Sequence, residues 1–290
     1  MTTTVTSIEG NRQSLDGGAM FGNVPRPMWE GWLKPDEKGR IKLACRALLI
    51  EHQGKRILCE TGIGAFFEPK LRERFGVEES EHCLLKNLNS LGLDENDIDF
   101  VILSHLHFDH AGGLLPSYED IQSGQDRLLF PRARYIIGAE AFARAERPHL
   151  RDRASFIPGM VEKLKASGRL TLVTGTRLDD VFPDRLEFVF SHGHTPAQMH
   201  TLFRGETSSI FFAGDLIPGT PWVHLPVTMG YDRYPEQLID EKAAVYAKAV
   251  PEHWWVFYTH DIRYPMSEIQ LSQGKYQPAN CQTDVLRRSI

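Results

Sequence analysis

Three histidines and an aspartate lie within six positions, directly after a short apolar run. The segment reads VILSHLHFDHAGG from Val101 to Gly113, and its candidate metal ligands are His105, His107, Asp109 and His110. Imidazole nitrogens and carboxylate oxygens are common ligands of zinc and similar divalent ions. Residues two apart in an extended segment point the same way, so His105 and His107 can present imidazoles to one ion. Asp109 and His110 follow where a helix is expected to begin, so the turn aims a second pair of ligands at a neighbouring position.

Further candidate ligands follow later apolar runs. His194 comes after LEFVFSHG, Asp215 after SIFFAG and His260 after WWVFYT. In proteins built from helices and parallel strands, sites form at the carboxyl ends of the strands. We therefore expect these three side chains to join the first segment. His192 competes with His194 for this role on spacing alone.

The elements that must position these residues are short strands and interleaved helices. The expected strands are ACRALLIEH, KRILCE, DFVILSH, ARYIIG, RLTLVT, LEFVFSH, SIFFAGD and WWVFYTH. Gln53-Gly54 supplies the turn of a hairpin between the first two. Helices are expected over 82–93, 159–168 and 235–250. We find no repeat and no long linker, so residues 1–290 are expected to form one layered domain of helices and strands, α+β in class.

Composition excludes several classes of protein. The net charge of -5 lacks the basic excess of a protein that grips nucleic acid. No stretch approaches the roughly 18 apolar residues of a membrane span, and the first residues lack an apolar signal segment. Four cysteines, Cys45, Cys59, Cys83 and Cys281, form no C-x-x-C pair and are expected to be free thiols. The sequence thus predicts a cytoplasmic protein with neither a nucleic acid nor a membrane as partner.

The motifs SHLHFDHAGG, GHTP, AGD and TH, in this order, resemble those of the metallo-β-lactamase superfamily over roughly residues 44–261. The resemblance implies an αββα four-layer sandwich that holds two divalent metal ions, with zinc expected and manganese, iron or cobalt as alternatives. GHTP selects His194 over His192. The implied ligands are His105, His107 and His194 for the first ion, Asp109, His110 and His260 for the second, and Asp215 as the bridge. The implied reaction is hydrolysis by a metal-bridging hydroxide, with Asp109 as a candidate proton carrier.

A second stretch narrows the expected substrate. LDGGAMFGNVPRPMW, Leu15 to Trp29, resembles the N-terminal segment of the quorum-quenching lactonases, which open N-acyl homoserine lactones. That resemblance implies that an N-terminal arm, residues 1–40, covers the active-site edge. It implies that Met20, Phe21 and Phe108 line a pocket for an acyl chain. The alternative for this segment is an arm whose Phe21, Met28 and Trp29 side chains pack on the core. The expected partner is a small lactone or ester, and the expected assembly is a homodimer.

Two positions depart from the family pattern. Pro218 stands where those lactonases place a tyrosine that contacts the substrate carbonyl, so His224 or Tyr231 is the candidate replacement donor. In CETGIG, Glu60 stands where the superfamily usually has aspartate. Glu60 is one methylene longer and is expected to orient a metal-binding histidine from behind, with altered reach.

Other functions share these motifs. The same centre would suit a phosphotriester (organophosphate) or aryl-ester hydrolase, and a phosphodiester substrate would require basic side chains near the metals. Arg26, Arg233 and Arg263 lie near the candidate loops in sequence. An iron-dependent oxidoreductase and a non-catalytic binding protein are further alternatives. The full set of seven ligands argues against a site with a single iron ion and against a non-catalytic scaffold that has lost ligands. The sequence leaves the physiological substrate, the acyl-chain preference and the resting metal open.

Overall fold

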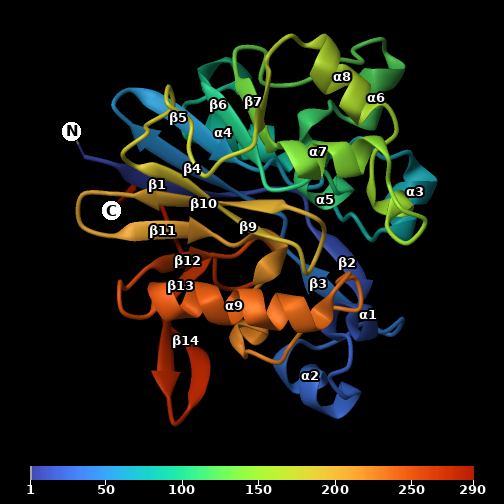
Figure 1. The fold of residues 1–290 in the computed structure, drawn as a ribbon. Coiled ribbons are helices and arrows are strands. Elements are labelled where there is room, and N and C mark those ends of the chain that lie inside the picture. The colour runs from blue at the N-terminus through green and yellow to red at the C-terminus, as the bar shows by residue number, and fades with distance from the viewer. Residues whose placement is uncertain (1) are drawn as a thin grey trace.

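The fold consists of two β-sheets packed face to face, with helices on the outer face of each (Figure 1). The computed structural model describes residues 2–290. The larger sheet has the order β15-β1-β4-β5-β6-β7-β8, and the smaller has the order β14-β13-β12-β11-β10-β9. A separate ribbon pairs β2 with β3.

The strands of the larger sheet are β1 (Thr4–Glu9), β4 (Arg46–His52), β5 (Lys55–Cys59), β6 (Phe100–Leu103), β7 (Arg134–Gly138), β8 (Leu170–Val173) and β15 (Arg288–Ser289). Those of the smaller sheet are β9 (Leu186–Ser191), β10 (Gln198–Arg204), β11 (Ser209–Phe212), β12 (Trp255–Phe257), β13 (Met266–Ser272) and β14 (Lys275–Gln282). The ribbon consists of β2 (Gln13–Asp16) and β3 (Arg40–Leu43).

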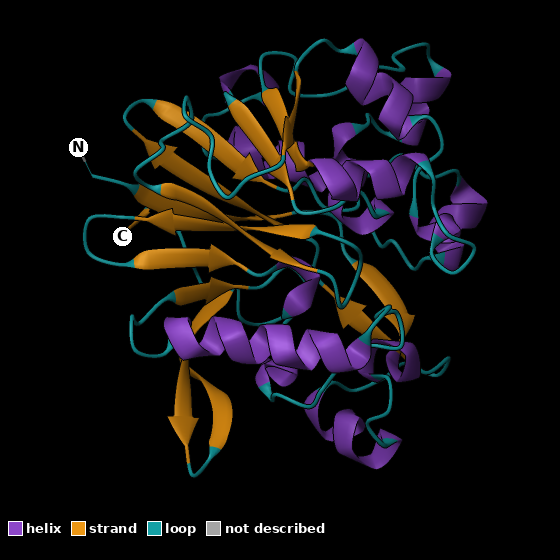
Figure 2. Cartoon of the chain, viewed as in Figure 1, coloured by secondary structure: helices purple, strands orange, loops and turns teal. Residues whose placement is uncertain are grey.

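The helices are short except for the last. They are α1 (Gly17–Phe21), α2 (Arg26–Trp32), α3 (Pro69–Arg74), α4 (Cys83–Ser90), α5 (Phe108–Ala111), α6 (Tyr118–Gln122), α7 (Ala139–Glu146), α8 (Met160–Ala166) and α9 (Pro235–Ala249). Single 3₁₀ turns are η1 (Glu95–Asp97), η2 (Gly112–Leu114), η3 (Arg153–Ser155), η4 (Gly214–Leu216) and η5 (Thr220–Val223). Figure 2 shows α9 lying along one sheet, while most of the other helices lie beside the opposite sheet.

Three apolar clusters separate the layers. The central cluster joins the facing sides of both sheets, with Ile50 and Ile57 from one and Phe188 and Phe212 from the other. A second cluster packs α4, α7 and α8 on the larger sheet, and a third packs α9 on the smaller one. Alternate strand residues point to opposite faces, so each sheet can feed two clusters. This arrangement confirms the predicted αββα sandwich.

The strand directions bring the candidate site together. β5, β6, β7 and β8 are parallel, so the segments that follow them leave from one edge. β9 and β11 are both antiparallel to β10, and β11 is parallel to β12, so β9, β11 and β12 also run the same way. Segments that are far apart in the chain therefore meet where these strands end.

The N-terminal residues differ from the expected arm. Thr4–Glu9 is β1, which pairs with β4 inside the larger sheet because Val5 and Ile8 are buried there. The part of the N-terminal segment that reaches the edge of the site is residues 13–32, which form β2, α1 and α2. Leu15 and Met20 of this part line the cavity described below. The expected arm, residues 1–40, thus contains both a strand of the larger sheet and a segment that covers the site.

The remaining expectations about elements agree with the structure. All eight predicted runs contain a strand, the hairpin turns at Gln53 and Gly54 with positive φ angles of 50° and 75°, and the three predicted helices are α4, α8 and α9.

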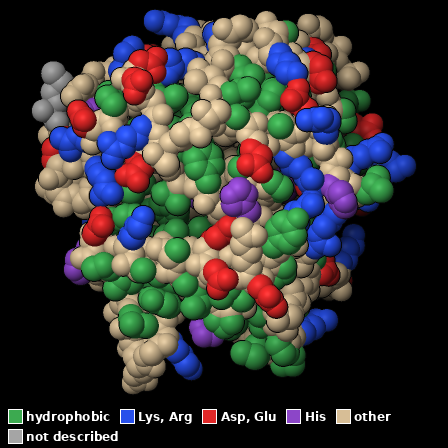
Figure 3. Space-filling view, viewed as in Figure 1, with side chains coloured by type: hydrophobic (Ala, Val, Ile, Leu, Met, Phe, Trp, Pro, Cys, Tyr) green, Lys and Arg blue, Asp and Glu red, His purple; other side chains and the backbone are tan. Residues whose placement is uncertain are grey.

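All four cysteines are free thiols. Separately from these expectations, each helix within residues 2–290 is too short or too polar to span a bilayer. Basic and acidic side chains are interspersed on the face shown in Figure 3.

Candidate metal centre

Seven predicted ligands converge at the shared sheet edge. His105 and His107 follow β6, Asp109 and His110 lie on α5, and His194, Asp215 and His260 follow β9, β11 and β12. Ligand atoms of His105, His107, His194 and Asp215 lie within 4.8 Å of one another, as do those of Asp109, His110 and His260. The structure therefore brings together all seven residues that the sequence singled out, in two adjacent groups, and His192 belongs to neither group.

The two glycines that end the motif let its helix approach the turn after β5. A Cβ atom on Gly113 would lie 2.0 Å from the carbonyl oxygen of Thr61, and one on Gly112 would lie 2.2 Å from that of Ile63. The amide of Gly113 donates to the carbonyl of Gly62 at 2.9 Å, and the amide of Thr61 donates to that of His110 at 3.0 Å. Larger residues at 112 and 113 would push α5, and with it Asp109 and His110, away from the centre.

Four of the five histidines are anchored through Nδ1, which leaves Nε2 directed at the centre. His110 Nδ1 donates to Glu60 Oε2 at 2.6 Å, and His194 Nδ1 donates to Asp232 Oδ1 at 2.9 Å. His260 Nδ1 donates to the carbonyl of Ala44 at 2.7 Å. His105 Nδ1 lies 2.9 Å from the hydroxyl of Ser104. A histidine that donates through Nδ1 offers the lone pair of Nε2, which is the form that binds a metal.

Glu60 supports two of these histidines at once. One carboxylate oxygen accepts from His110, and the other accepts from the Ser104 hydroxyl, which in turn faces His105. Glu60 is fully buried and has a positive φ of 62°, so a strained backbone position delivers its side chain. The extra methylene relative to aspartate thus still places the carboxylate behind the ligands.

The arrangement of lone pairs fits bound cations. Nε2 of His110 lies 3.3 Å from Nε2 of His260, and Nε2 of His194 lies 3.3 Å from Nδ1 of His107. Two lone pairs that face each other repel unless a cation or a proton lies between them. Nε2 of His105 is buried without a hydrogen-bond partner among residues 2–290. Such an orphaned acceptor is costly in the protein interior and is satisfied by a metal ion.

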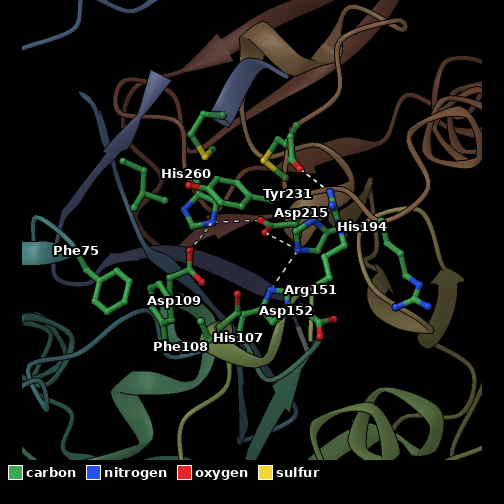
Figure 4. Close-up of a pocket in the computed structure, with 17 residues that line it drawn as sticks. Phe75, His107, Phe108, Asp109, Arg151, Asp152, His194, Asp215, Tyr231 and His260 are labelled. Atoms are coloured by element: carbon green, nitrogen blue, oxygen red, sulfur yellow. Dashed lines mark hydrogen bonds and ion pairs between the residues drawn. The ribbon is translucent and has the colours of Figure 1, made fainter. Parts of the chain in front are cut away.

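Asp215 lies between the two groups. Its Oδ2 is 3.2 Å from His194 Nε2 and 3.3 Å from His110 Nε2, and its Oδ1 is 3.1 Å from His260 Nε2. Figure 4 shows this carboxylate flanked by His194 and His260. One carboxylate that reaches both groups suits a bridging ligand of a dinuclear site. The donor set contains nitrogen and oxygen and no sulfur, so it suits zinc as well as manganese, iron or cobalt.

Charges within the cluster divide the histidines. Burial lowers the pKa of His107 to about 3 and holds the pKa of His105 well below its usual value. Burial also opposes the charged forms of His110 and His260, but nearby carboxylates outweigh it and raise both pKa values well above normal. These carboxylates are Glu60, Asp215 and Asp109 for His110, and Asp215 for His260. The metal-free centre therefore holds protons where a cation would bind.

Comparisons with known proteins bear on the fold and on the segment that carries the first candidate ligands. The sequence profile of the metallo-beta-lactamase superfamily matches residues 40–122, which include the first four candidate ligands. The chain has the metallo-β-lactamase fold. A crystal structure of a probable metal-dependent hydrolase from Staphylococcus aureus is similar over 100% of this chain and 98% of that one, with 26% identity and a TM-score of 0.84.

Other similar proteins share less of the sequence. AidC, described as a dizinc quorum-quenching lactonase in complex with its product, has 18% identity and a TM-score of 0.73, and the match covers 99% of this chain and 96% of that one. A metallo-beta-lactamase fold-containing protein of Sulfurisphaera tokodaii is 25% identical over 49% of this chain, and a probable metallo-hydrolase of Mycobacterium bovis is 28% identical over 41%. The matched part spans 54% and 37% of those two relatives.

A cavity of about 320 Å³ opens beside the seven candidate ligands. Its apolar lining comes from Leu15, Met20, Phe75, Phe108 and Met229, and its polar lining includes Arg151, Asp152, Ser155, Tyr231 and Arg233. His107, Asp109, His194, Asp215 and His260 form part of the same wall. Figure 4 shows Phe75 and Phe108 on one side of the centre, with Arg151 and Asp152 on another. The cavity thus has an apolar part and a charged part.

The structure separates the predicted pocket residues into two classes. Met20, Phe108 and Tyr231 line the cavity. Phe21 does not line it; its ring stacks on Trp222 at 4.6 Å between centroids and on Trp29 at 5.7 Å. Consecutive residues of α1 point in different directions, so Met20 faces the cavity while Phe21 fills the core. Phe21 therefore lies in the core, outside the cavity lining that was expected to include it.

His224 also lies outside the cavity lining. Its carbonyl accepts from the buried Lys242 ammonium at 3.1 Å, together with the carbonyls of Leu225 and Val227 at 3.1 and 3.0 Å. Lys242 thereby fixes this loop against α9, and the loop turns back to the centre only at Met229. The structure therefore favours Tyr231 over His224 as the side chain that can face a substrate.

Sequence reasoning missed three supporting residues. Asp232 holds His194, and its second oxygen accepts from the amide of Met229 at 2.6 Å. Gln13 donates to Asp109 Oδ2 at 2.8 Å. Arg151 reaches the cavity from the segment after α7, where no motif indicated a role. The one available signal was the acidic residue that follows Tyr231 in GYD, since neither Gln13 nor Arg151 stands beside a ligand in sequence.

Proposed function

We propose that this protein is a metal-dependent hydrolase that opens a lactone or a similar carboxylic ester, using two divalent ions, with zinc as the expected metal. The main observation behind this proposal is the cavity, because its apolar wall lies next to the two groups of candidate metal ligands. Two ions held there would polarise the ester carbonyl and activate the attacking water. Water adds to the acyl carbon, the acyl carbon–oxygen bond breaks, and the products are a carboxylate and an alcohol.

Asp109 is the proposed proton carrier of this reaction. Its Oδ2 is held by Gln13, and its two oxygens each lie 3.7 Å from an imidazole, Oδ1 from His110 Nε2 and Oδ2 from His260 Nε2. Burial raises the pKa of Asp109, but His110 and His260 outweigh burial and lower it. The carboxylate is therefore charged at neutral pH and can accept the proton that the water loses and return it to the leaving oxygen.

Tyr231 is the proposed donor to the substrate. Its side chain lines the cavity, and 45% of its surface is exposed. Burial raises the pKa of Tyr231, and the carboxylates of Asp109 and Asp16 raise it further. The phenol therefore keeps its proton at neutral pH and can hydrogen-bond to the carbonyl oxygen as negative charge develops there.

N-acyl homoserine lactones are the first substrates to test, because the fold is also that of AidC and the apolar wall suits an acyl chain. Hydrolysis of N-hexanoyl and N-dodecanoyl homoserine lactone should be measured with protein as isolated, stripped by a chelator, and refilled with zinc or manganese. We expect ring opening that depends on metal, and its abolition by Asp109→Ala or His260→Ala. Activity that survives His260→Ala would exclude the two-ion version of the proposal.

A phosphotriester or aryl-ester hydrolase is the alternative function. One structural neighbour is the hydrolase AbOPH, described as belonging to the beta lactamase superfamily, at 18% identity and a TM-score of 0.74. The same metal-loaded preparations should be tested on paraoxon and 4-nitrophenyl acetate. Turnover of these without any lactone opening would replace the lactonase proposal with this one.

We also propose that the protein works in the cytoplasm as a homodimer. Light scattering coupled to size-exclusion chromatography tests the assembly, since one chain has a mass of 33.0 kDa and a dimer has twice that mass.

A further inference from the structure

The guanidinium group of Arg233 presents buried donors that make no hydrogen bond within residues 2–290. Arg233 lines the cavity, and its Nε and Nη1 are buried without a hydrogen-bond partner in the described part of the chain. Its Cζ lies 5.1 Å from the centroid of the Tyr234 ring, which supports the planar group but offers no lone pair to it in the plane. Because arginine does not lose its proton in proteins, these donors stay charged and require a partner.

The position of Arg233 ties it to the metal centre. Arg233 follows Asp232, the residue that anchors His194, and its own amide donates to the His194 carbonyl at 3.2 Å. The backbone of Arg233 is thus held to one of the seven candidate ligands. Its side chain is therefore fixed relative to the place where the reacting bond would lie.

A second guanidinium lines the same cavity from a distant segment. Nη2 of Arg151 donates to the carbonyl of Gly230 at 2.8 Å and to that of Asp232 at 3.1 Å. These bonds hold Arg151 beside the loop that carries Arg233. Asp152 lies on the same wall. Its Oδ2 accepts from Nη2 of Arg144 at 2.7 Å, so part of its negative charge is already paired. On this part of the wall, two guanidinium groups therefore lie near one partly paired carboxylate.

We propose that Arg233, assisted by Arg151, forms an oxyanion-binding subsite, so that the substrate of this centre carries a carboxylate or phosphate group in addition to its ester and apolar part. Guanidinium groups recognise carboxylates and phosphates through two parallel hydrogen bonds. An N-acyl homoserine lactone carries no such charge and offers Arg233 only single neutral carbonyl oxygens, which bind a guanidinium group more weakly. The inference rests on the proposed ester hydrolysis and narrows it to acid-bearing esters.

A matched pair of esters tests this specificity. Mono(4-nitrophenyl) glutarate carries a free carboxylate, and its methyl ester has the same leaving group without the charge. We expect Arg233→Gln to raise KM for the acid about ten- to hundredfold and to raise KM for the methyl ester by a much smaller factor. Arg151→Gln should act in the same direction with a smaller effect. The control is Arg153→Gln, an exposed residue of η3 that does not line the cavity.

A binding measurement separates this proposal from the proposed function. Isothermal titration calorimetry should be carried out with hexanoate and with hexyl phosphate, on zinc-loaded wild type, Arg233→Gln and Arg153→Gln. Weaker anion binding by Arg233→Gln alone supports the subsite even if no ester is cleaved, and the tighter of the two probes identifies the anion. Equal binding by all three proteins, with zinc content and melting temperature unchanged, would overturn the subsite. In that case Arg233 pairs within the chain, with the unpartnered Oδ1 of Asp152 as the available acceptor.

Discussion

The carboxylate of Glu60 lies 2.6 Å from Nδ1 of His110 and reaches His105 through the hydroxyl of Ser104. One buried side chain thus orients a candidate ligand in each group, His110 in the second and His105 in the first. Because Glu60 holds a ligand of each group, we expect it to affect the affinity of the whole centre for metal ions.

Replacement of Glu60 by glutamine should weaken zinc binding. The amide can accept from only one of its two neighbours, and its NH₂ group would face a donor. We expect the affinity to fall about ten- to hundredfold, as is usual when a partner behind a metal ligand is removed. Competition with a chromophoric chelator measures this, and Glu140→Gln on the exposed side of α7 is the control. Equal affinities for the two variants would contradict the orienting role.

Replacement of Asp232 by asparagine should affect the first metal group selectively. The amide of asparagine can accept from His194 Nδ1 or from the amide of Met229 but not from both, and its NH₂ group would face the other donor, so the His194 ring would be held less firmly. We expect zinc titration to show one tight site and a second that is about ten- to hundredfold weaker. Asp240→Asn, exposed on α9, should keep two equivalent tight sites. Loss of both sites together, with a lowered melting temperature, would instead indicate collapse of the loop.

Metal affinity should fall as pH falls through the neutral range. Carboxylates raise the pKa of His110 and His260 well above normal, so the metal-free protein carries protons that the ion must displace. Affinity should drop about tenfold per pH unit for each displaced proton. Titrations between pH 6 and 8, repeated in buffers with different ionisation enthalpies, give both the slope and the proton count. A flat profile with no proton release would show that these histidines are neutral before the metal binds.

Lys242→Met should destabilise the protein. Lys242 is fully buried, and its ammonium group donates to three carbonyls of the 224–227 segment. Methionine would leave these acceptors unsatisfied, so we expect the free energy of unfolding to fall by about 3 kcal/mol. Urea denaturation measures this, and Lys248→Met on the exposed face of α9 should change little. Equal stability of the two variants would mean that water replaces the ammonium group.

Gly113→Ala should displace the metal motif. The added Cβ would lie 2.0 Å from the Thr61 carbonyl oxygen, which belongs to the backbone and cannot turn away. We expect a loss of about 2 kcal/mol in stability and a reduced zinc content, because α5 carries two candidate ligands. Gly175→Ala, where the new methyl group meets nothing within 4 Å, is the control for mutating a glycine. Thermal unfolding and metal analysis of both variants compare the two effects.

The sequence by itself determined the elements and the list of candidate ligands. His105, His107, Asp109 and His110 are close in the chain, so the local geometry of a strand end and a helix start already groups them. Alternating apolar and polar runs indicated the strands, and the strand ends indicated where His194, Asp215 and His260 would meet.

Only the tertiary structure decided what surrounds those ligands. Glu60, Asp232 and Gln13 act across 50, 38 and 96 positions of sequence, so no local pattern could pair them with His110, His194 and Asp109. Tyr231 faces the cavity and His224 does not, because Lys242 holds the loop between them against α9. Arg151 joins Arg233 at one wall because the segment after α7 packs on the 230–232 loop. Side-chain direction and loop path depend on long-range packing, and both are set only when the layers come together.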